Sequence, residues 1–218
     1  MNDPRFDEKR FDTLPVVGIL RGFSAEETAG ALAAAVRGGL TTAEITLDTP
    51  GATDQIRAAI EEHGHALNVG AGTVTSVERL EQALAAGATF VVTPTLVQGV
   101  IERCVARGIP VFPGALSPTE IVRAWDLGAR LVKVFPADGK GARFIAALKE
   151  ALPEVGLMPT GGVRAATLGE FARAGAGGFG VGGPLFDRER VASGDWGWVE
   201  AQCRSFREAW QACEPVRA

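Results

Sequence analysis

The sequence predicts an α/β protein that forms a single (β/α)8 TIM barrel with an N-terminal helical extension. Short β-branched runs recur eight times, and each is followed by a helical pattern. The runs start about 20 to 26 residues apart, which suits a strand, a helix of about three turns and two short loops. Strict alternation favours a parallel sheet, and eight such units in about 200 residues favour a closed barrel over an open sheet.

The eight runs define the elements in chain order. Each is rich in β-branched or other apolar residues and is bounded by Gly, Pro, Thr or a charged residue. The segment ahead of them, residues 1–14, is predicted to form an arm or a helix, and residues 15–218 to form the barrel domain. The predicted strands cover residues 16–21, 42–47, 67–73, 90–94, 110–114, 131–136, 156–161 and 178–182.

Capping residues mark the helices between these strands. Ser24 precedes an alanine-rich run and is followed three residues later by Glu27, the spacing of a capping box. Ser117 stands before Pro118 at the first helical position, with Glu120 at the third. Glycines that are expected to stop helices just before the next strand lie at positions 38–39, 87, 108, 128 and 175.

Composition excludes several classes of function. The formal net charge of −4 gives no reason to expect a nucleic acid or an anionic membrane as a partner. No run of about 18 apolar residues is present, so no membrane span is predicted. The charged N-terminus lacks the apolar core of a secretory signal. We therefore expect a cytoplasmic protein.

The cysteines and histidines do not indicate a metal site. Cys104, Cys203 and Cys213 are an odd number without the spacing of metal ligands, and we expect them to be reduced thiols. His63 and His65 fall at the end of a predicted helix and are expected to face solvent. No metal and no cofactor are therefore predicted.

One lysine lies inside a predicted strand. The segment from Leu131 to Phe135 alternates, which places Leu131, Lys133 and Phe135 on one face and Val132 and Val134 on the other. Valines suit the face that helices cover, so Lys133 is expected to point into the barrel. Burial lowers the pKa of an amine and gives the neutral form that attacks a carbonyl. The alternative is a structural lysine paired with a carboxylate.

Glu44 is the second ionisable residue that alternation places inside the barrel. Ile45 and Leu47 share the helix-facing side of the second predicted strand, so Glu44 and Thr46 face inward. A buried carboxyl group has a raised pKa, which suits a group that must both take and give a proton. A salt bridge to Lys133 without chemistry stays an open alternative.

Small and polar residues end the other predicted strands. Chemistry in barrel enzymes lies at the carboxyl ends of the strands, and glycines after the seventh and eighth strands commonly bind phosphate through backbone amides. The segments at these ends are Gly70-Ala71-Gly72-Thr73, Thr93-Pro94, Thr160-Gly161-Gly162-Val163 and Gly180-Val181-Gly182-Gly183.

Together these residues resemble the 2-keto-3-deoxy-6-phosphogluconate (KDPG) aldolase family, which includes phosphogalactonate and 4-hydroxy-2-oxoglutarate aldolases. The resemblance runs from about Leu14 to Phe186. Its carriers stand in order at the strand ends, and they are Gly18-Ile19-Leu20-Arg21-Gly22, Glu44-Ile45-Thr46-Leu47, Gly70-Ala71-Gly72-Thr73-Val74, Thr93-Pro94, Phe112-Pro113-Gly114, Lys133-Val134-Phe135-Pro136-Ala137 and Pro159-Thr160-Gly161-Gly162-Val163.

The resemblance implies a class I aldolase that cleaves a 2-keto-3-deoxy (6-phospho) sugar acid or 4-hydroxy-2-oxoglutarate to pyruvate and an aldehyde such as glyceraldehyde 3-phosphate. It implies that Lys133 forms the Schiff base, that Glu44 is the general acid and base, and that Thr73 helps hold the pyruvyl carboxylate. It also implies a homotrimer that needs no metal. The substrate-binding residues expected are Arg21, Thr46, Thr73, Pro94, Phe135, Thr160, Gly161, Gly162, Gly182 and Gly183.

Two positions depart from the family. The phosphogluconate enzymes carry an arginine where this chain has Asp48, and often a serine where it has Pro184. Both changes remove groups that attract an anion, and Arg21 is the residue that would compensate. We therefore expect a poorer preference for 6-phosphorylated substrates. Alternatively, Asp48 turns outward and caps the following helix.

Two other functions remain to be weighed. A sugar-phosphate isomerase or epimerase would use Glu44 as its base and Lys133 only as an electrostatic partner, without an imine. A non-enzymatic protein that binds a metabolite would need neither residue, so the presence of both argues against it. The sequence does not fix the C4 stereochemistry of the substrate or a requirement for phosphate.

Overall fold

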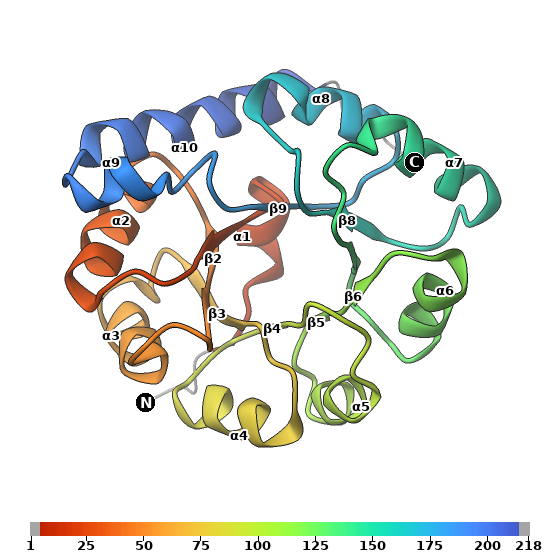
Figure 1. Cartoon of the computed structure of the whole chain (residues 1–218), viewed down its shortest axis with the longest axis horizontal. Helices are drawn as coiled ribbons and strands as arrows, with labels where there is room; N and C mark the ends of the chain where they lie inside the picture. The colour runs from red at the N-terminus through yellow and green to blue at the C-terminus, as the bar shows by residue number, and fades with distance from the viewer. Residues whose placement is uncertain (1–4, 214–218) are drawn as a thin grey trace.

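The computed structural model describes residues 5–213, which fold as an α/β chain with a curled parallel sheet. Figure 1 shows the strands grouped around a common centre, with helices α2 to α10 outside them and α1 behind the centre. The strands are β1 (Val16–Leu20), β2 (Thr42–Thr46), β3 (Asn68–Gly72), β4 (Val91–Val92), β5 (Val111–Phe112), β6 (Gly114–Ala115), β7 (Val132–Val134), β8 (Leu157–Pro159) and β9 (Phe179–Val181).

Helices alternate with these strands along the described chain, as the sequence predicts. A short additional helix, α1, precedes the first strand. The helices are α1 (Glu8–Thr13), α2 (Ala25–Arg37), α3 (Ala52–His63), α4 (Val77–Ala85), α5 (Gln98–Ala106), α6 (Pro118–Asp126), α7 (Gly141–Ala151), α8 (Ala165–Arg173), α9 (Arg188–Ala192) and α10 (Trp196–Gln211).

The strands pair in parallel in two sheets. Six strands follow the order β5-β4-β3-β2-β1-β9, and three follow the order β6-β7-β8. Two isolated parallel bridges, Leu157 to Ala176 and Thr160 to Gly180, join the β8 side of the smaller sheet to the chain around β9. The carboxyl ends of all these strands therefore lie on one side of the molecule.

The fifth predicted strand, residues 110–114, is wrong as a single element. It forms the two-residue strands β5 and β6, which are separated at Pro113. Proline has no N–H to donate and interrupts a ladder. β5 pairs with β4, and β6 pairs with β7. The Pro113 carbonyl still accepts a hydrogen bond from the backbone N–H of Lys133, at 2.8 Å.

The predicted helix caps are confirmed. Ser24 and Glu27 form a capping box at the start of α2, and Ser117 and Glu120 form another at the start of α6, with Pro118 in the first turn. Each box satisfies backbone N–H groups that have no partner inside the helix.

Buried side chains separate into two groups on the two faces of the strands. The larger group lies between strands and helices and includes Val132 and Val134. The smaller group lies on the opposite face and includes Leu131, two residues before Lys133. Side chains alternate along a strand, so Lys133 lies on the same face as the smaller group, as predicted. The members of the smaller group are Phe11, Val17, Phe90, Val92, Phe112, Leu131 and Met158, with Phe6 packed against them.

The expectation for one histidine is wrong. His65 is exposed, but His63 is only 8% exposed and lines a cavity of about 390 Å³ between α2 and α3. The reason is helical spacing, because His63 follows Ala59 by four residues on the buried face of α3. Within residues 5–213, no helix has both the length and the apolar character needed to cross a bilayer.

Candidate active site

Lys133 is a buried amine near the middle of the sheet. It belongs to β7, pairs with Gly114 and Met158 on the neighbouring strands, and is only 6% exposed. Its Nζ lies 5.1 Å from the centroid of the Phe135 ring. Burial lowers the pKa of the Lys133 ammonium, and Arg21 lowers it further, whereas Glu44 opposes the shift. A lowered pKa increases the fraction of neutral amine at a given pH, and a neutral amine is a nucleophile toward carbonyl carbon.

Glu44 is the buried carboxyl group of β2. It is 1% exposed, and its Oε2 has no hydrogen-bond partner. Burial raises its pKa, against the attraction of Lys133 and Arg21, and Asp48 raises it further. A raised pKa increases the fraction of a carboxyl group that holds its proton at a given pH.

A glycine on the next strand makes room for this carboxyl group. A Cβ on Gly72 would come within 2.7 Å of both Cδ and Oε1 of Glu44 and within 3.0 Å of the Thr46 methyl group. Gly72 therefore determines where the Glu44 carboxyl group lies. A larger residue at this position would displace it.

Lys133 and Glu44 influence one another without a direct ion pair. Each acts on the pKa of the other through space, but their charged atoms do not approach within the 4.0 Å of a salt bridge. A direct salt bridge, the alternative left open by the sequence, is therefore not formed. Arg21 acts on both groups, so the three side chains form one electrostatic unit.

Arg21, Asp48 and Thr73 meet at the carboxyl ends of β1, β2 and β3. Arg21 forms an ion pair with Asp48 and donates a hydrogen bond of 2.9 Å to Thr73 Oγ1. Thr73 has a φ of 55°, in the left-handed region, which costs a β-branched residue roughly 1–3 kcal/mol. Arg79 donates to the Thr73 carbonyl at 3.3 Å and holds this conformation. Strain of this kind is typical of functional sites.

The capping alternative for Asp48 is wrong. Helix α3 begins at Ala52, and its N-cap is Gly51, without a side-chain hydrogen bond. Asp48 pairs with Arg21 instead, because β1 and β2 are neighbours and bring their carboxyl ends together.

Three other predicted residues are held near these groups. Thr46 is buried, and its hydroxyl lies 3.1 Å from that of Thr49. Pro94 packs its carbonyl against Gly114, the residue that pairs with Lys133. Thr160 is buried, donates its N–H to the carbonyl of the residue after Lys133, and bridges to the chain at position 180.

The four remaining predicted residues gather in one cavity. Gly161, Gly162, Gly182 and Gly183 line a space of about 260 Å³ at the carboxyl ends of β8 and β9. Lys133 and Glu44 are not among its lining residues. The lining also includes Arg164, the N-cap residue of α8, and helix N-termini favour an anion through their backbone N–H groups.

Sequence reasoning missed two charged residues in this cavity. Asp138 and Arg164 both line it. A Cβ on Gly161 would come within 2.1 Å of Asp138 Oδ2, so the carboxylate packs directly against the glycine turn. The available signal for Arg164 was its place directly after Gly-Gly-Val at a helix start. Asp138 gave no such signal, because it reaches the cavity from the loop after β7.

Among residues 5–213, no three His, Cys, Asp or Glu side chains gather as a metal site would require. The arrangement brings together a buried amine, a buried carboxyl group that acts on its charge, a cation at the strand ends, and a cavity lined by glycines with Asp138 and Arg164.

Comparisons with known proteins show the family of the chain. The family model described as KDPG and KHG aldolase matches residues 8–202. The chain is 32% identical over 199 residues to the 2-dehydro-3-deoxy-6-phosphogalactonate aldolase of Escherichia coli (strain K12), covering 91% of this chain and 97% of the relative.

Solved structures of aldolases superpose on this chain. A structure described as native KDPGal superposes with a TM-score of 0.85 at 30% identity, covering 92% of this chain and 96% of the other. The KDPG aldolase of Legionella pneumophila, with pyruvate captured as a covalent carbinolamine intermediate, superposes with a TM-score of 0.80 at 25% identity. That match covers 90% of this chain and 96% of the other.

Proposed function

The chain belongs to the KDPG and KHG aldolase family, and from that premise we propose that it cleaves a 2-keto-3-deoxy sugar acid to pyruvate through a Schiff base on Lys133. The observation that carries the mechanism is a buried lysine with a lowered pKa beside a buried glutamate with a raised one. The two shifts have opposite directions: the first increases the fraction of neutral amine, and the second increases the fraction of protonated carboxyl group.

The first steps join the substrate to the enzyme. The neutral Lys133 amine attacks the C2 carbonyl of the 2-keto acid, and the carbinolamine takes up a proton from solvent and loses water to give an iminium ion. Glu44 then takes the proton of the C4 hydroxyl. The C3–C4 bond breaks, the aldehyde leaves, and the electron pair of the broken bond moves into the iminium group to form an enamine.

The last steps release pyruvate. Glu44 returns the proton to C3 of the enamine, and water hydrolyses the resulting iminium ion to pyruvate, the free Lys133 amine and the proton that was taken up from solvent. Protons are conserved, because the one taken from the hydroxyl is the one given to carbon. The covalent carbinolamine described for the Legionella pneumophila enzyme supports the first step.

The strand ends supply the groups that bind the substrate. Thr73 is suited to its carboxylate, and Arg21, together with the glycine cavity and the start of α8, is suited to a terminal phosphate. Phe135, 39% exposed and close to Lys133, would cover one side of the bound pyruvyl group. Pro94, Thr46 and Thr160 would shape the remainder.

We also propose that residues 15–213 form one catalytic domain, a closed (β/α)8 barrel; residues 214–218 of the predicted domain and residues 1–4 of the predicted arm lie outside the described residues. The supporting observations are the pairing of β9 with β1 and the bridge between Thr160 and Gly180. In this arrangement the break at Pro113 is a change of pairing partner within one barrel strand.

Release of pyruvate from a panel of substrates tests the proposed function. The panel contains phosphorylated and unphosphorylated 2-keto-3-deoxy acids of both C4 configurations and 4-hydroxy-2-oxoglutarate, with lactate dehydrogenase as the coupled readout. We expect pyruvate from at least one member at an enzymatic rate. Isomerisation or epimerisation without pyruvate would instead support the alternative barrel enzyme.

Asp48 is expected to reduce the preference for phosphorylated substrates. Asp48 forms an ion pair with the Arg21 guanidinium. Arg21 stands two residues after Ile19, and Ile19 lies beside Gly182, which lines the glycine cavity. Replacing Asp48 by Arg adds a cation and releases Arg21. We expect the ratio of kcat/KM for phosphorylated over unphosphorylated substrate to rise about tenfold, or about 1.4 kcal/mol in transition-state binding.

Two matched variants complete this measurement. Asp48→Asn removes the charge with little change in shape and should give a smaller rise. Asp54→Asn breaks an exposed ion pair with Arg57 on α3 and should leave the ratio unchanged. An unchanged ratio in Asp48→Arg would show that Asp48 does not act on the anion.

A further inference from the structure

Beneath Lys133 lies a layer of aromatic and aliphatic side chains. Leu131 precedes Lys133 on the same face of the strand, and Met158 pairs with Lys133 on β8. Phe90 and Phe112 complete the layer, with ring centroids 5.7 Å apart. All four are at most 4% exposed. The amine therefore rests on an apolar layer toward the amino ends of the strands.

Helix α1 closes this layer from below. Phe11 of α1 is 1% exposed, and its ring centroid lies 5.9 Å from that of Phe112. Phe6 lies 5.5 Å from Phe90 by the same measure and 5.8 Å from Phe11. The aromatic rings of residues 6 and 11 thus cover the apolar layer where water would otherwise reach it.

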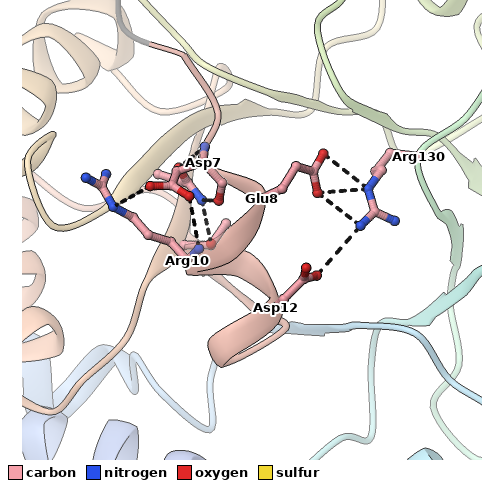
Figure 2. A network of polar contacts seen from close by, with 7 residues as sticks. Asp7, Glu8, Arg10, Asp12 and Arg130 are labelled. Carbon is pink, nitrogen blue, oxygen red and sulfur yellow. Dashed lines mark hydrogen bonds and ion pairs between the residues drawn. The ribbon is translucent and has the colours of Figure 1, made fainter. Parts of the chain in front are cut away.

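Polar contacts fasten α1 at the amino ends of the strands (Figure 2). Arg130 pairs with Glu8 at 3.0 Å and with Asp12 at 3.8 Å, and its guanidinium lies 5.7 Å from the centroid of the Phe11 ring. On the other side of α1, the Asp7 N–H donates to Asn68 Oδ1 at 2.8 Å, and Asn68 Nδ2 donates back to the Asp7 carbonyl at 2.9 Å.

These two sets of contacts join α1 to the residues at the amino ends of two strands of the site. Arg130 stands three residues before Lys133, and Asn68 opens β3, the strand that ends beside Thr73. The charged groups that act on Lys133 from the surrounding strands are Glu44 of β2 and Arg21 after β1. The neighbouring strands β6 and β8 contribute no ionisable side chain.

Resting on the proposed imine chemistry, we propose that α1 is the floor of the lysine pocket and that Phe11 is a positioning residue which keeps water away from the Lys133 amine. Phe11 acts through Phe112 and Leu131 and touches no substrate. The N-terminal helix is then part of the catalytic apparatus as well as a contributor to stability.

The physical consequence is a dependence on pH. Burial is the largest cause of the lowered pKa of Lys133. Water that enters from below solvates the ammonium form and raises this pKa toward the ordinary value of a lysine. The fraction of neutral amine then falls at every pH below the new pKa, and the midpoint of imine formation moves to higher pH.

The experiment uses the full-length protein at subsaturating pyruvate from pH 6 to 9.5. It measures the rate at which cyanoborohydride reduces the imine between pyruvate and Lys133 to a stable adduct. For Phe11→Ala we expect the midpoint to rise by about one unit, with about a tenfold lower rate at the acid end and a rate within about twofold of wild type at the alkaline end. Phe11→Leu refills most of the space, and its pH midpoint should return most of the way to the wild-type value.

A second variant keeps the proposal testable if Phe11→Ala fails to fold. Arg130→Gln removes both ion pairs to α1 and leaves the aromatic layer in place, and it should raise the midpoint in the same direction by a smaller amount. Arg37→Gln is the matched control, because it breaks an ion pair with Glu200 far from α1 and should leave the midpoint unchanged.

The outcomes separate this proposal from the proposed function. Absence of trapping in the wild type would overturn imine chemistry itself. If the wild type is trapped and a folded Phe11→Ala or Arg130→Gln protein has the same pH midpoint, imine chemistry stands. The proposed role of α1 as the floor of the lysine pocket is then overturned. A uniform loss of rate at every pH, without a shift of the midpoint, would also overturn it, since that is the result of a purely structural defect.

Discussion

Replacement of Lys133 by Ala or by Arg is expected to lower turnover by about 10⁴-fold or more, because the reaction then has no amine to form the imine. Arginine retains the positive charge beside Glu44 but stays protonated and is not a nucleophile. Steady-state release of pyruvate from the best substrate of the panel measures the effect. Both variants should be folded by circular dichroism.

Lys149→Arg is the matched control for this loss. Lys149 also has a pKa lowered by burial, but its ammonium donates to the carbonyls of Pro153 and Val155 after α7. It lies away from the site, and the control should keep turnover within about twofold of wild type. Substantial turnover in Lys133→Arg would show that Lys133 acts only as a charge, as the isomerase alternative requires.

Replacement of Glu44 by Gln is expected to lower turnover by about 10² to 10⁴-fold, while the imine still forms slowly. Glutamine has nearly the same shape but neither takes nor gives a proton. Exchange of the pyruvate methyl protons with deuterated water, followed by NMR, should fall in parallel. This exchange reports proton transfer at C3 without the aldehyde.

Thermal unfolding separates the catalytic from the structural role of Glu44. Its Oε2 has no hydrogen-bond partner and no salt bridge joins it to Lys133, so Glu44→Gln is not expected to lower the midpoint of unfolding. Exchange at the wild-type rate in this variant would show that the base lies elsewhere. A large loss of stability with normal exchange would mark Glu44 as a structural partner.

Local patterns in the sequence predict much of the fold. Ser24 with Glu27 shows where a helix starts, since the side chains that cap it are a few residues away. Alternation around Lys133 places it opposite the valines that face the helices, and the two valines are indeed in the core between strands and helices. These inferences need only neighbouring residues.

Contacts between distant segments are not visible in such patterns. The ion pair of Arg21 with Asp48 depends on two strand ends that meet in space, and the sequence left Asp48 equally able to cap a helix. Asp138 lines the glycine cavity from the loop after β7, whereas the glycines follow β8 and β9, so this contact also depends on segments that meet only in space. Residues 1–14 were predicted as a helix or arm, but nothing local indicates that Phe11 lies below the lysine pocket.

Backbone conformation is the other feature that local patterns did not reveal. Thr73 stands in the motif that resembles the family, yet nothing in its type predicts a φ of 55°. The sequence also does not show that the strand around Pro113 divides into β5, which pairs with β4, and β6, which pairs with β7. Both features adjust the strand ends where the substrate is expected to bind.

The measurement that tests the imine mechanism most directly is the position of the trapped adduct. The wild-type protein is reduced with borohydride in the presence of pyruvate, digested and analysed by mass spectrometry. The account predicts one reduced pyruvyl group on the peptide that contains Lys133, and its loss in Lys133→Ala. An adduct on the peptide of Lys140 or Lys149, or none at all under conditions of turnover, would contradict it.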